Sequence, residues 1–179
     1  MNLQEVSSLL NRAELLCEEA YCESSLRKVA KEITNELRQA FPLVISVMEG
    51  GVVFTGKLLP LLNFPLDFDY VHVSRYQKAL VGSTPTWFRC PGQKSVHQRT
   101  VLVIDDLLDE GKTLLEIKKR VLELGASNCY TAVFANKILT QKKALEVDFF
   151  GLEVPDRYVF GYGMDVKGYW RNLPAIYAL

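Results

Sequence analysis

Several features that mark particular classes of protein are scarce in this sequence. It holds only four cysteines, and no two of them form a C-x-x-C pair: Cys17, Cys22, Cys90 and Cys129. Structural disulfides and a zinc site are therefore not expected. No apolar run approaches the ~18 residues that cross a membrane, and the N-terminal residues show no apolar signal segment. We expect a cytoplasmic protein that does not act at a membrane.

An excess of charge of either sign is also missing. Lysine plus arginine and aspartate plus glutamate both number 21, so the net charge is zero. A dedicated nucleic-acid binder usually carries a basic excess, so nucleic acid is not an expected partner. What is present is the 49% hydrophobic share of an ordinary globular protein. We expect a single domain over residues 1–179, because this length is enough for one sizeable core.

Apolar segments typical of strands alternate with segments of helical periodicity. Strands are predicted at 43–48, within 64–76, at 101–105, at 129–134 and near 158–160, and helices at 52–62, at 112–124 with Gly125 as C-cap and, as a short one, around 138–145. Residues 3–40 are predicted to form two helices with a break at 21–24, the second capped by Ser24 or Ser25. This alternation favours an α/β fold with a parallel sheet covered on both faces.

Residues 74–99 differ from the rest of the chain. They are rich in Ser, Thr and Gln, and they contain Gly82, Pro85, Pro91 and Gly92. A loop of this length in a compact domain is usually functional or disordered. We therefore predict a lid or binding loop here, with a small hairpin around Trp87 as the alternative.

The stretch Val101–Thr113 reads VLVIDDLLDEGKT and is the centre of the predicted site. A short apolar run suits a buried strand, and the adjacent acids Asp105 and Asp106 follow it. In open α/β sheets, ligands bind at the carboxyl ends of the strands. The backbone N–H groups at the start of the next helix can cradle a phosphate, while the acids can hold a divalent metal or accept hydrogen bonds from sugar hydroxyls. The alternative is that the acids are solvated charges at a strand end.

VLVIDDLLDEGKTL resembles the phosphoribosyl-pyrophosphate motif of type I phosphoribosyltransferases, in which an apolar strand, two acids, two apolar residues and an Asp precede Gly, a basic residue and Thr. Downstream, FANKI, VDFFGLEVPDRYVFGYGMD and YWRNLP resemble the C-terminal half of the hypoxanthine-guanine members, in order and spacing. VMEGG and SRY stand where that family has its first active-site loop and the start of its mobile loop. The resemblance covers roughly residues 25–175.

The resemblance implies a fold and an activity. The fold is a central, mostly parallel sheet flanked by helices, with a core at about 40–160, a small hood from the N-terminal helices and the residues after 160, and a mobile lid at about 74–99. The activity is transfer of the phosphoribosyl group from phosphoribosyl pyrophosphate to N9 of a 6-oxopurine, hypoxanthine or guanine, with Mg2+ as cofactor. The implied assembly is a homodimer or homotetramer.

The resemblance also implies a role for each matching residue. Asp105 and Asp106 would hold the ribose hydroxyls and their magnesium ion, and Asp109 would act as general base or acid at N7 of the purine. The backbone of four residues would wrap the 5′-phosphate: Glu110, Gly111, Lys112 and Thr113.

The implied purine contacts lie further along the chain. Lys137 would donate to the 6-oxo group, Tyr158 would stack on the ring, and the backbone around Val159 would recognise the exocyclic position. Taken alone, Lys137 is interpreted more plainly as a solvated lysine that opens a helix, and Tyr158 as a core aromatic residue.

On the pyrophosphate side, Asp165 would bind a metal and Arg171 would contact the pyrophosphate. The remaining implied residues are Glu49 and Gly50 in the first loop, and Ser74, Arg75 and Tyr76 at the start of the lid. Taken alone, Asp165 is an ordinary loop acid. The histidines, His72 and His97, receive no role.

Two residues depart from the family pattern. Glu49 stands where many relatives have a basic residue, and a glutamate cannot attract pyrophosphate. We therefore expect backbone amides to make any contact there, across a cis peptide after Met48. Glu110 replaces a small hydroxyl residue, which weakens phosphate binding unless the carboxylate points outward.

Two other functions are compatible with parts of the pattern. One is a non-catalytic regulator on the same fold that binds the sugar phosphate or a nucleotide, and the other is a phospho-accepting receiver domain. Asp109 and Lys137 together favour an enzyme, and the neutral charge disfavours a regulator that acts on nucleic acid. In receiver domains the acid pair belongs to the first strand, whereas here two strand candidates precede it. The choice among hypoxanthine, guanine and xanthine stays open.

Overall fold

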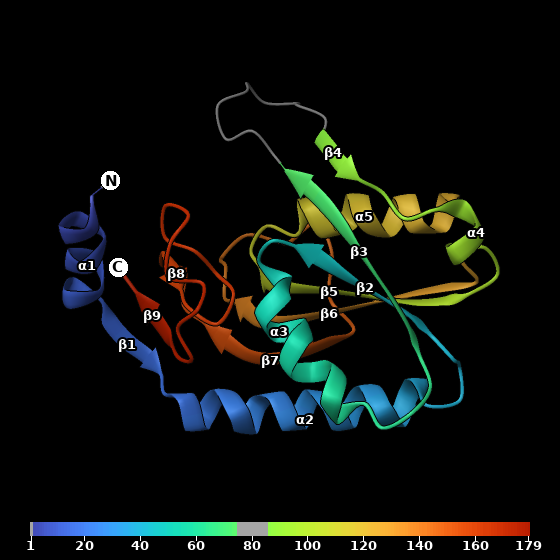
Figure 1. The fold of residues 1–179 in the computed structure, drawn as a ribbon, viewed down its shortest axis with the longest axis horizontal. Coiled ribbons are helices and arrows are strands. Elements are labelled where there is room, and N and C mark those ends of the chain that lie inside the picture. The colour runs from blue at the N-terminus through green and yellow to red at the C-terminus, as the bar shows by residue number, and fades with distance from the viewer. Residues whose placement is uncertain (1, 75–85) are drawn as a thin grey trace.

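The main sheet of the protein has six strands in the order β4-β3-β2-β5-β6-β7 (Figure 1). The computed structural model describes residues 2–74 and 86–179. The strands are β2 (Leu43–Met48), β3 (Asp67–Ser74), β4 (Thr86–Arg89), β5 (Thr100–Leu108), β6 (Asn128–Lys137) and β7 (Phe149–Val154). All neighbouring pairs are parallel except β4, which runs antiparallel to β3. The predicted α/β fold with a mostly parallel sheet is confirmed.

Helices cover both faces of this sheet (Figure 1). Val44, Leu102 and Phe134 pack in one cluster with residues of α2 (Glu19–Leu37) and α3 (Gly51–Leu58), which the 3-10 turn η1 (Leu59–Leu61) follows. Ile45 and Val103 point the other way and pack with α5 (Lys112–Glu123) and with α4 (Gln93–Val96). Because each central strand is buried on both faces, its sequence is an unbroken apolar run.

A second, three-stranded sheet joins the two ends of the chain. Its order is β1-β9-β8, and it contains β1 (Glu14–Cys17), β8 (Val159–Phe160) and β9 (Ile176–Ala178). Helix α1 (Leu3–Arg12) begins at a capping box between Asn2 and Glu5. The indole of Trp170 donates to the carbonyl of Val6 at 2.9 Å. Figure 1 shows both termini beside this small sheet, which lies at one end of the main one.

Two predictions of secondary structure are wrong, and one strand of the main sheet was not predicted. Helix α2 runs through 21–24 without a break and begins after Glu18, so neither Ser24 nor Ser25 is its cap. The chain breaks earlier, where β1 leaves the helical pattern to pair with β9. Residues 138–145 form no helix, and strand β7, which the sequence analysis missed, follows them.

The other predicted strands and helices are confirmed, with β5 and β6 longer than expected. The C-cap of α5 is Leu124 and not the predicted Gly125, which follows it in the left-handed conformation with a φ of +91°. The hairpin alternative around Trp87 is also confirmed, because β4 pairs with β3. The residues that join these two strands, 75–85, lie outside the described residues, and they form part of the predicted lid at 74–99.

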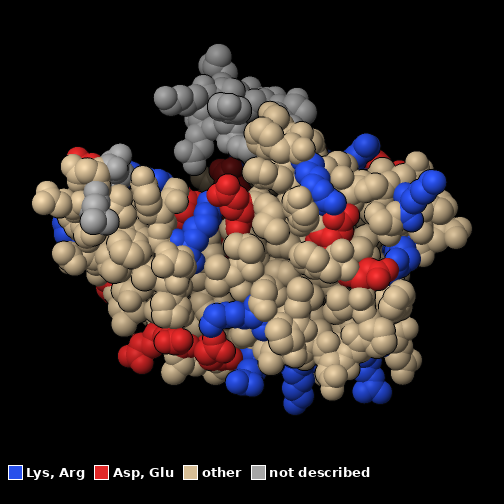
Figure 2. All heavy atoms as spheres, viewed as in Figure 1, with Lys and Arg blue, Asp and Glu red and all other residues tan. Residues whose placement is uncertain are grey.

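The surface carries both signs of charge. Figure 2 shows lysine and arginine interspersed with aspartate and glutamate on the displayed face. None of the helices in the described ranges combines the length and apolar character that a membrane crossing needs.

Candidate active site

A cavity of about 740 Å³ lies at the carboxyl ends of β2, β5 and β6. It brings together most of the predicted site residues: Glu49, Gly50, Asp105, Asp106, Asp109, Glu110, Gly111, Lys112, Thr113, Lys137, Tyr158, Val159, Asp165 and Arg171. Ser74 is the last residue of β3, whereas Arg75 and Tyr76 lie outside the described residues. A site at this edge of the sheet is what the strand topology predicts.

The turn between β5 and α5 leaves the start of the helix open to a ligand. Gly111 is its N-cap, with a φ of +77°, and no side chain caps the helix. A residue with a side chain is strained in this left-handed conformation. The first N–H groups of a helix have no partner within it and carry the positive end of the helix dipole, so they can bind an anion.

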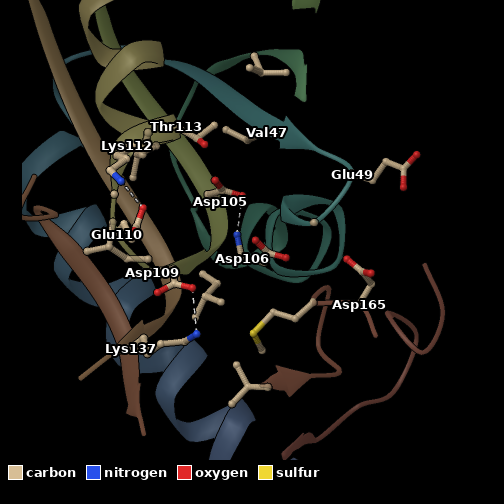
Figure 3. A pocket seen from close by; sticks show the side chains of 18 of the residues that line it. Val47, Glu49, Asp105, Asp106, Asp109, Glu110, Lys112, Thr113, Lys137 and Asp165 are labelled. Carbon is tan, nitrogen blue, oxygen red and sulfur yellow. Dashed lines mark hydrogen bonds and ion pairs between the residues drawn. The ribbon is translucent and has the colours of Figure 1, made fainter. Parts of the chain in front are cut away.

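The carboxylate of Glu110 is exposed and paired with a lysine. Its side chain is 63% exposed, and Oε2 lies 2.6 Å from Nζ of Lys112. Figure 3 shows the two side chains meeting beside the turn. The neighbouring lysine therefore offsets the unusual charge, and exposure to solvent screens what remains of it.

Asp105 and Asp106 form a partly buried acid pair at the middle of the cavity (Figure 3). Burial raises the pKa of Asp105 well above its ordinary range, and the charge of Asp106 adds to this effect. Burial likewise raises the pKa of Asp106. Among residues 2–74 and 86–179, the cation that approaches the pair is Arg171, whose Nη1 lies 4.0 Å from Oδ2 of Asp106. Within this part of the chain the pair is therefore short of positive charge.

This deficit fits a divalent cation. Carboxylate oxygens are the donors that magnesium prefers, and it usually takes only one or two of them and completes its shell with water and substrate oxygens. In residues 2–74 and 86–179, no three His, Cys, Asp or Glu side chains converge as ligands. The cavity offers carboxylates on two sides, from Asp105 and Asp106 and from Asp165. Each side could supply one or two ligands to a magnesium ion whose other ligands come from the substrate and water.

Lys137 and Asp109 form an ion pair at the other end of the cavity. Nζ of Lys137 donates to Oδ2 of Asp109 at 2.9 Å, and the lysine side chain is only 10% exposed (Figure 3). Lys137 ends strand β6 and opens no helix. A buried ammonium group needs such a partner, because desolvation of an unpaired charge is costly. Lys137 is therefore not a solvated surface lysine.

Tyr158 and Val159 line the same cavity with different exposures. The side chain of Tyr158 is 53% exposed although it lines the cavity, so it is not a core aromatic residue. Val159 is buried at the start of β8. An exposed ring at the mouth of a cavity is available to stack on a planar ligand.

Arg171 is the centre of the charged network on the opposite side. Its Nη2 lies 2.9 Å from Oδ1 of Asp165 and 3.6 Å from Oε2 of Glu49, and its Nη1 donates to the carbonyl of Gly163 at 2.8 Å. The peptide between Met48 and Glu49 is cis, as the sequence analysis expected. Arg171 is therefore held by groups that an incoming anion can replace.

Close backbone contacts fix the first loop against the rest of the site. Gly163 has a φ of +108°, and a Cβ there would lie 2.3 Å from the carbonyl oxygen of Gly50. A Cβ on Gly50 would lie 2.0 Å from Oδ2 of Asp106. Glycine at both positions lets three distant segments meet around the acid pair.

The cavity also contains residues that the sequence analysis did not assign: Val47, His72, Val73, Leu107, Leu108, Leu114, Met164 and, through its backbone turn, Met48. The ring of His72 lies 4.8 Å from that of Phe88. His72 is aligned with Met48 in the parallel pairing of β2 and β3. Its position near the end of a predicted strand was a signal, but one histidine without a partner in sequence gave no chemistry to assign.

Residues 20–167 match the family described as the phosphoribosyl transferase domain. The chain therefore belongs to the phosphoribosyltransferase family, as the resemblance of the Val101–Thr113 stretch implied.

Its relatives place it more narrowly within this family. The chain is 31% identical over 163 residues to the hypoxanthine-guanine phosphoribosyltransferase of Bacillus subtilis, which covers 91% of each chain. It is 30% identical over 167 residues to that of Aquifex aeolicus, covering 93% and 94% of the two chains. A solved hypoxanthine phosphoribosyltransferase of Staphylococcus aureus superposes with a TM-score of 0.86 at 26% identity, over 96% of this chain and 94% of that one.

Proposed function

We propose that the protein is a purine-salvage enzyme that transfers the 5-phosphoribosyl group from phosphoribosyl pyrophosphate to N9 of hypoxanthine or guanine. The products are IMP or GMP and pyrophosphate. One observation carries this proposal. A single cavity contains the uncapped start of α5, the Asp105–Asp106 pair and the Asp109–Lys137 ion pair, groups whose chemistry suits a phosphate, a ribose and a purine respectively.

The sugar phosphate is placed by the turn and the acid pair. The N–H groups from Glu110 to Thr113 receive the 5′-phosphate at the helix start. Asp105 and Asp106 accept hydrogen bonds from the ribose hydroxyls, and the same carboxylates would hold a magnesium ion. When bound, magnesium offsets the negative charge that develops on the leaving pyrophosphate.

The purine is placed by the ion pair. In the proposed complex, Lys137 donates to the 6-oxo group, and the Asp109 carboxylate accepts a hydrogen bond from N7. A 6-oxopurine offers an acceptor to the lysine, whereas a 6-aminopurine offers a donor that the ammonium group cannot accept. The exposed ring of Tyr158 stacks on the base.

The transfer step follows from this arrangement. The bond between C1′ and the pyrophosphate oxygen breaks, and the pyrophosphate leaves with the electron pair. N9 forms the new bond to C1′, and the N7 proton passes to Asp109. Positive charge develops on the ribose ring, so the carboxylates of Asp105 and Asp106 stabilise this state. Arg171 donates to the pyrophosphate in place of its present contacts with Glu49 and Asp165.

A panel of nucleobases tests the proposal. The purified protein is supplied with phosphoribosyl pyrophosphate, magnesium and one of hypoxanthine, guanine, xanthine, adenine or uracil, and nucleotide formation is followed. We expect turnover with hypoxanthine or guanine, loss of turnover with a magnesium chelator, and none with adenine. No turnover with any 6-oxopurine would remove the proposal. The relatives described above carry enzyme names, so the comparisons do not favour the regulator hypothesis.

We further propose that the protein assembles as a homodimer or homotetramer. Light scattering of the eluted protein at several concentrations gives the mass of the particle. A mass near that of one 20.3 kDa chain at all concentrations contradicts this expectation.

A further inference from the structure

The segment that follows β6 contacts the turn between β5 and α5, which is the proposed phosphate-binding turn. Nζ of Lys143 donates to the carbonyl of Leu108 at 3.1 Å and to Oδ1 of Asn136 at 2.5 Å. The next residue, Ala144, donates its N–H to the carbonyl of Glu110 at 2.9 Å. A Cβ on Gly111 would lie 3.3 Å from the N–H nitrogen of Leu145. Because the backbone of Ala144 and Leu145 lies against this turn, residues 138–145 do not form the predicted helix.

Lys143 donates hydrogen bonds to the two residues that immediately precede the members of the ion pair, Asp109 and Lys137. Leu108 precedes Asp109, Asn136 precedes Lys137, and Leu108 and Asn136 are aligned neighbours in β5 and β6. The Lys143 ammonium group therefore links the last aligned residues of β5 and β6. The next residue of each strand is a member of the ion pair.

The surroundings of Lys143 differ from those of a solvated lysine. Burial lowers its pKa, although the nearby carboxylates of Asp109 and Glu153 oppose that shift. Two of its three N–H bonds are donated to protein acceptors. The neighbouring Lys142 has an exposed side chain and supplies a matched comparison.

We propose that Lys143 is a positioning residue of the transfer reaction. It fixes the carbonyl of Leu108 and the side chain of Asn136, and through them the placement of the Asp109 carboxylate relative to the Lys137 ammonium group. This inference rests on the proposed function of the same site. A displacement of about 1 Å in catalytic geometry can cost on the order of a hundredfold in rate, so a residue that holds both groups has a kinetic effect without touching the substrate.

The first test compares Lys143→Met with Lys142→Met and Lys143→Arg in steady-state kinetics at 25 °C. We expect Lys143→Met to lower kcat about 10- to 100-fold, with KM for phosphoribosyl pyrophosphate changed less than about threefold, because the backbone contacts of Ala144 and Leu145 with the turn remain. Lys142→Met should match the wild type, and Lys143→Arg should recover most of kcat. A kcat in Lys143→Met within twofold of Lys142→Met overturns the proposal.

A double-variant cycle separates positioning from a general loss of fold. Asn136→Leu removes the acceptor without removing the lysine. If Lys143 acts through Asn136, the double variant loses little more kcat than Lys143→Met alone, whereas independent effects multiply. Multiplying effects contradict the proposal. Asn136→Leu also keeps the test informative if Lys143→Met does not fold.

A measurement without turnover distinguishes failure of this inference from failure of the proposed function. Amide hydrogen exchange of the free protein reports on the stability of the turn. The amides of Ala144 and Leu115 donate to the carbonyls of Glu110 and Gly111 in this turn. We expect both amides to exchange at least about tenfold faster in Lys143→Met than in Lys142→Met. Unchanged exchange overturns the positioning role even if the wild type is active. Faster exchange supports it even if no nucleobase is turned over, a result that removes only the proposed function.

Discussion

Nζ of Lys137 lies 2.9 Å from Oδ2 of Asp109, although 28 positions separate the two residues in the chain. Asp109 follows Leu108 and Lys137 follows Asn136, and Leu108 and Asn136 are aligned in the parallel strands β5 and β6. The sheet register therefore creates the contact. In the free protein, Asp109 accepts a hydrogen bond from the buried ammonium group of Lys137. In the proposed complex the same two side chains face the purine.

The Lys137→Met variant tests the purine end of the site. A hydrogen bond to a charged donor contributes about 1.5–3 kcal/mol, so its loss should lower kcat/KM for hypoxanthine about 10- to 100-fold. KM for phosphoribosyl pyrophosphate should stay close to that of the wild type, because the lysine lies away from the phosphate turn. Lys142→Met is the control for removal of a nearby positive charge. Equal effects of the two variants would argue against a specific contact.

Glu49 gives a prediction about pyrophosphate. Its carboxylate is 3.6 Å from Nη2 of Arg171, and its side chain is 67% exposed. A carboxylate beside Arg171, the arginine proposed to bind pyrophosphate, should compete with the anion and repel it. In Glu49→Gln we expect product inhibition by pyrophosphate to strengthen about two- to fivefold, since an exposed pair of this kind contributes up to about 1 kcal/mol. Glu123→Gln, at the end of α5, is the control. An unchanged inhibition constant would show that Glu49 does not face the pyrophosphate.

Asp105 should lower the stability of the free protein. Burial and the charge of Asp106 raise the pKa of Asp105, so its ionised form is disfavoured in the folded state at neutral pH. Asp105→Asn should therefore raise Tm without ligands, by about 2–4 °C for each kcal/mol regained, while kcat falls at least about tenfold. Asp156→Asn, at an exposed site, should leave Tm unchanged. A lower Tm in Asp105→Asn contradicts this account of the pair.

The buried thiol of Cys22 predicts a loss of stability at alkaline pH. Burial raises its pKa to about 12, whereas an unfolded thiol ionises near pH 8.5. Between these values the folded state binds more protons, so the free energy of unfolding falls as pH rises, by about 1.4 kcal/mol per pH unit for this group. Urea unfolding from pH 8 to 11 should show a shallower fall in Cys22→Ala. Parallel curves for the variant and the wild type would contradict the prediction.

The phosphate half of the site could be predicted from sequence because it is local. Residues 101–113 contain the buried strand, the acids and the helix start in one continuous segment, and the structure has each of them in place. The contact between Asp109 and Lys137 is different, because it depends on how β5 and β6 align. The family resemblance implied that both residues contact the purine, but it did not predict the ion pair between them.

The errors also have physical causes. The apolar spacing of residues 3–40 is helical on both sides of β1, and β1 exists because β9, from the far end of the chain, pairs with it. Residues 138–145 have helical composition, but Lys143 and Ala144 are bonded to β5, β6 and the turn. Such long-range partners have no signature within a short window of sequence. The requirement for glycine at position 163 is also long-range, because a Cβ there would clash with the carbonyl oxygen of Gly50.

The most direct test of the central claim is single-turnover kinetics of Asp109→Asn with hypoxanthine, beside Glu123→Gln as a control. We expect the rate of IMP formation to fall about 10²- to 10⁴-fold, the usual contribution of a general acid or base. Phosphoribosyl pyrophosphate should still bind with an affinity close to that of the wild type, because its contacts lie at the turn and the acid pair. A near-native rate of IMP formation in Asp109→Asn would contradict the assignment of this site.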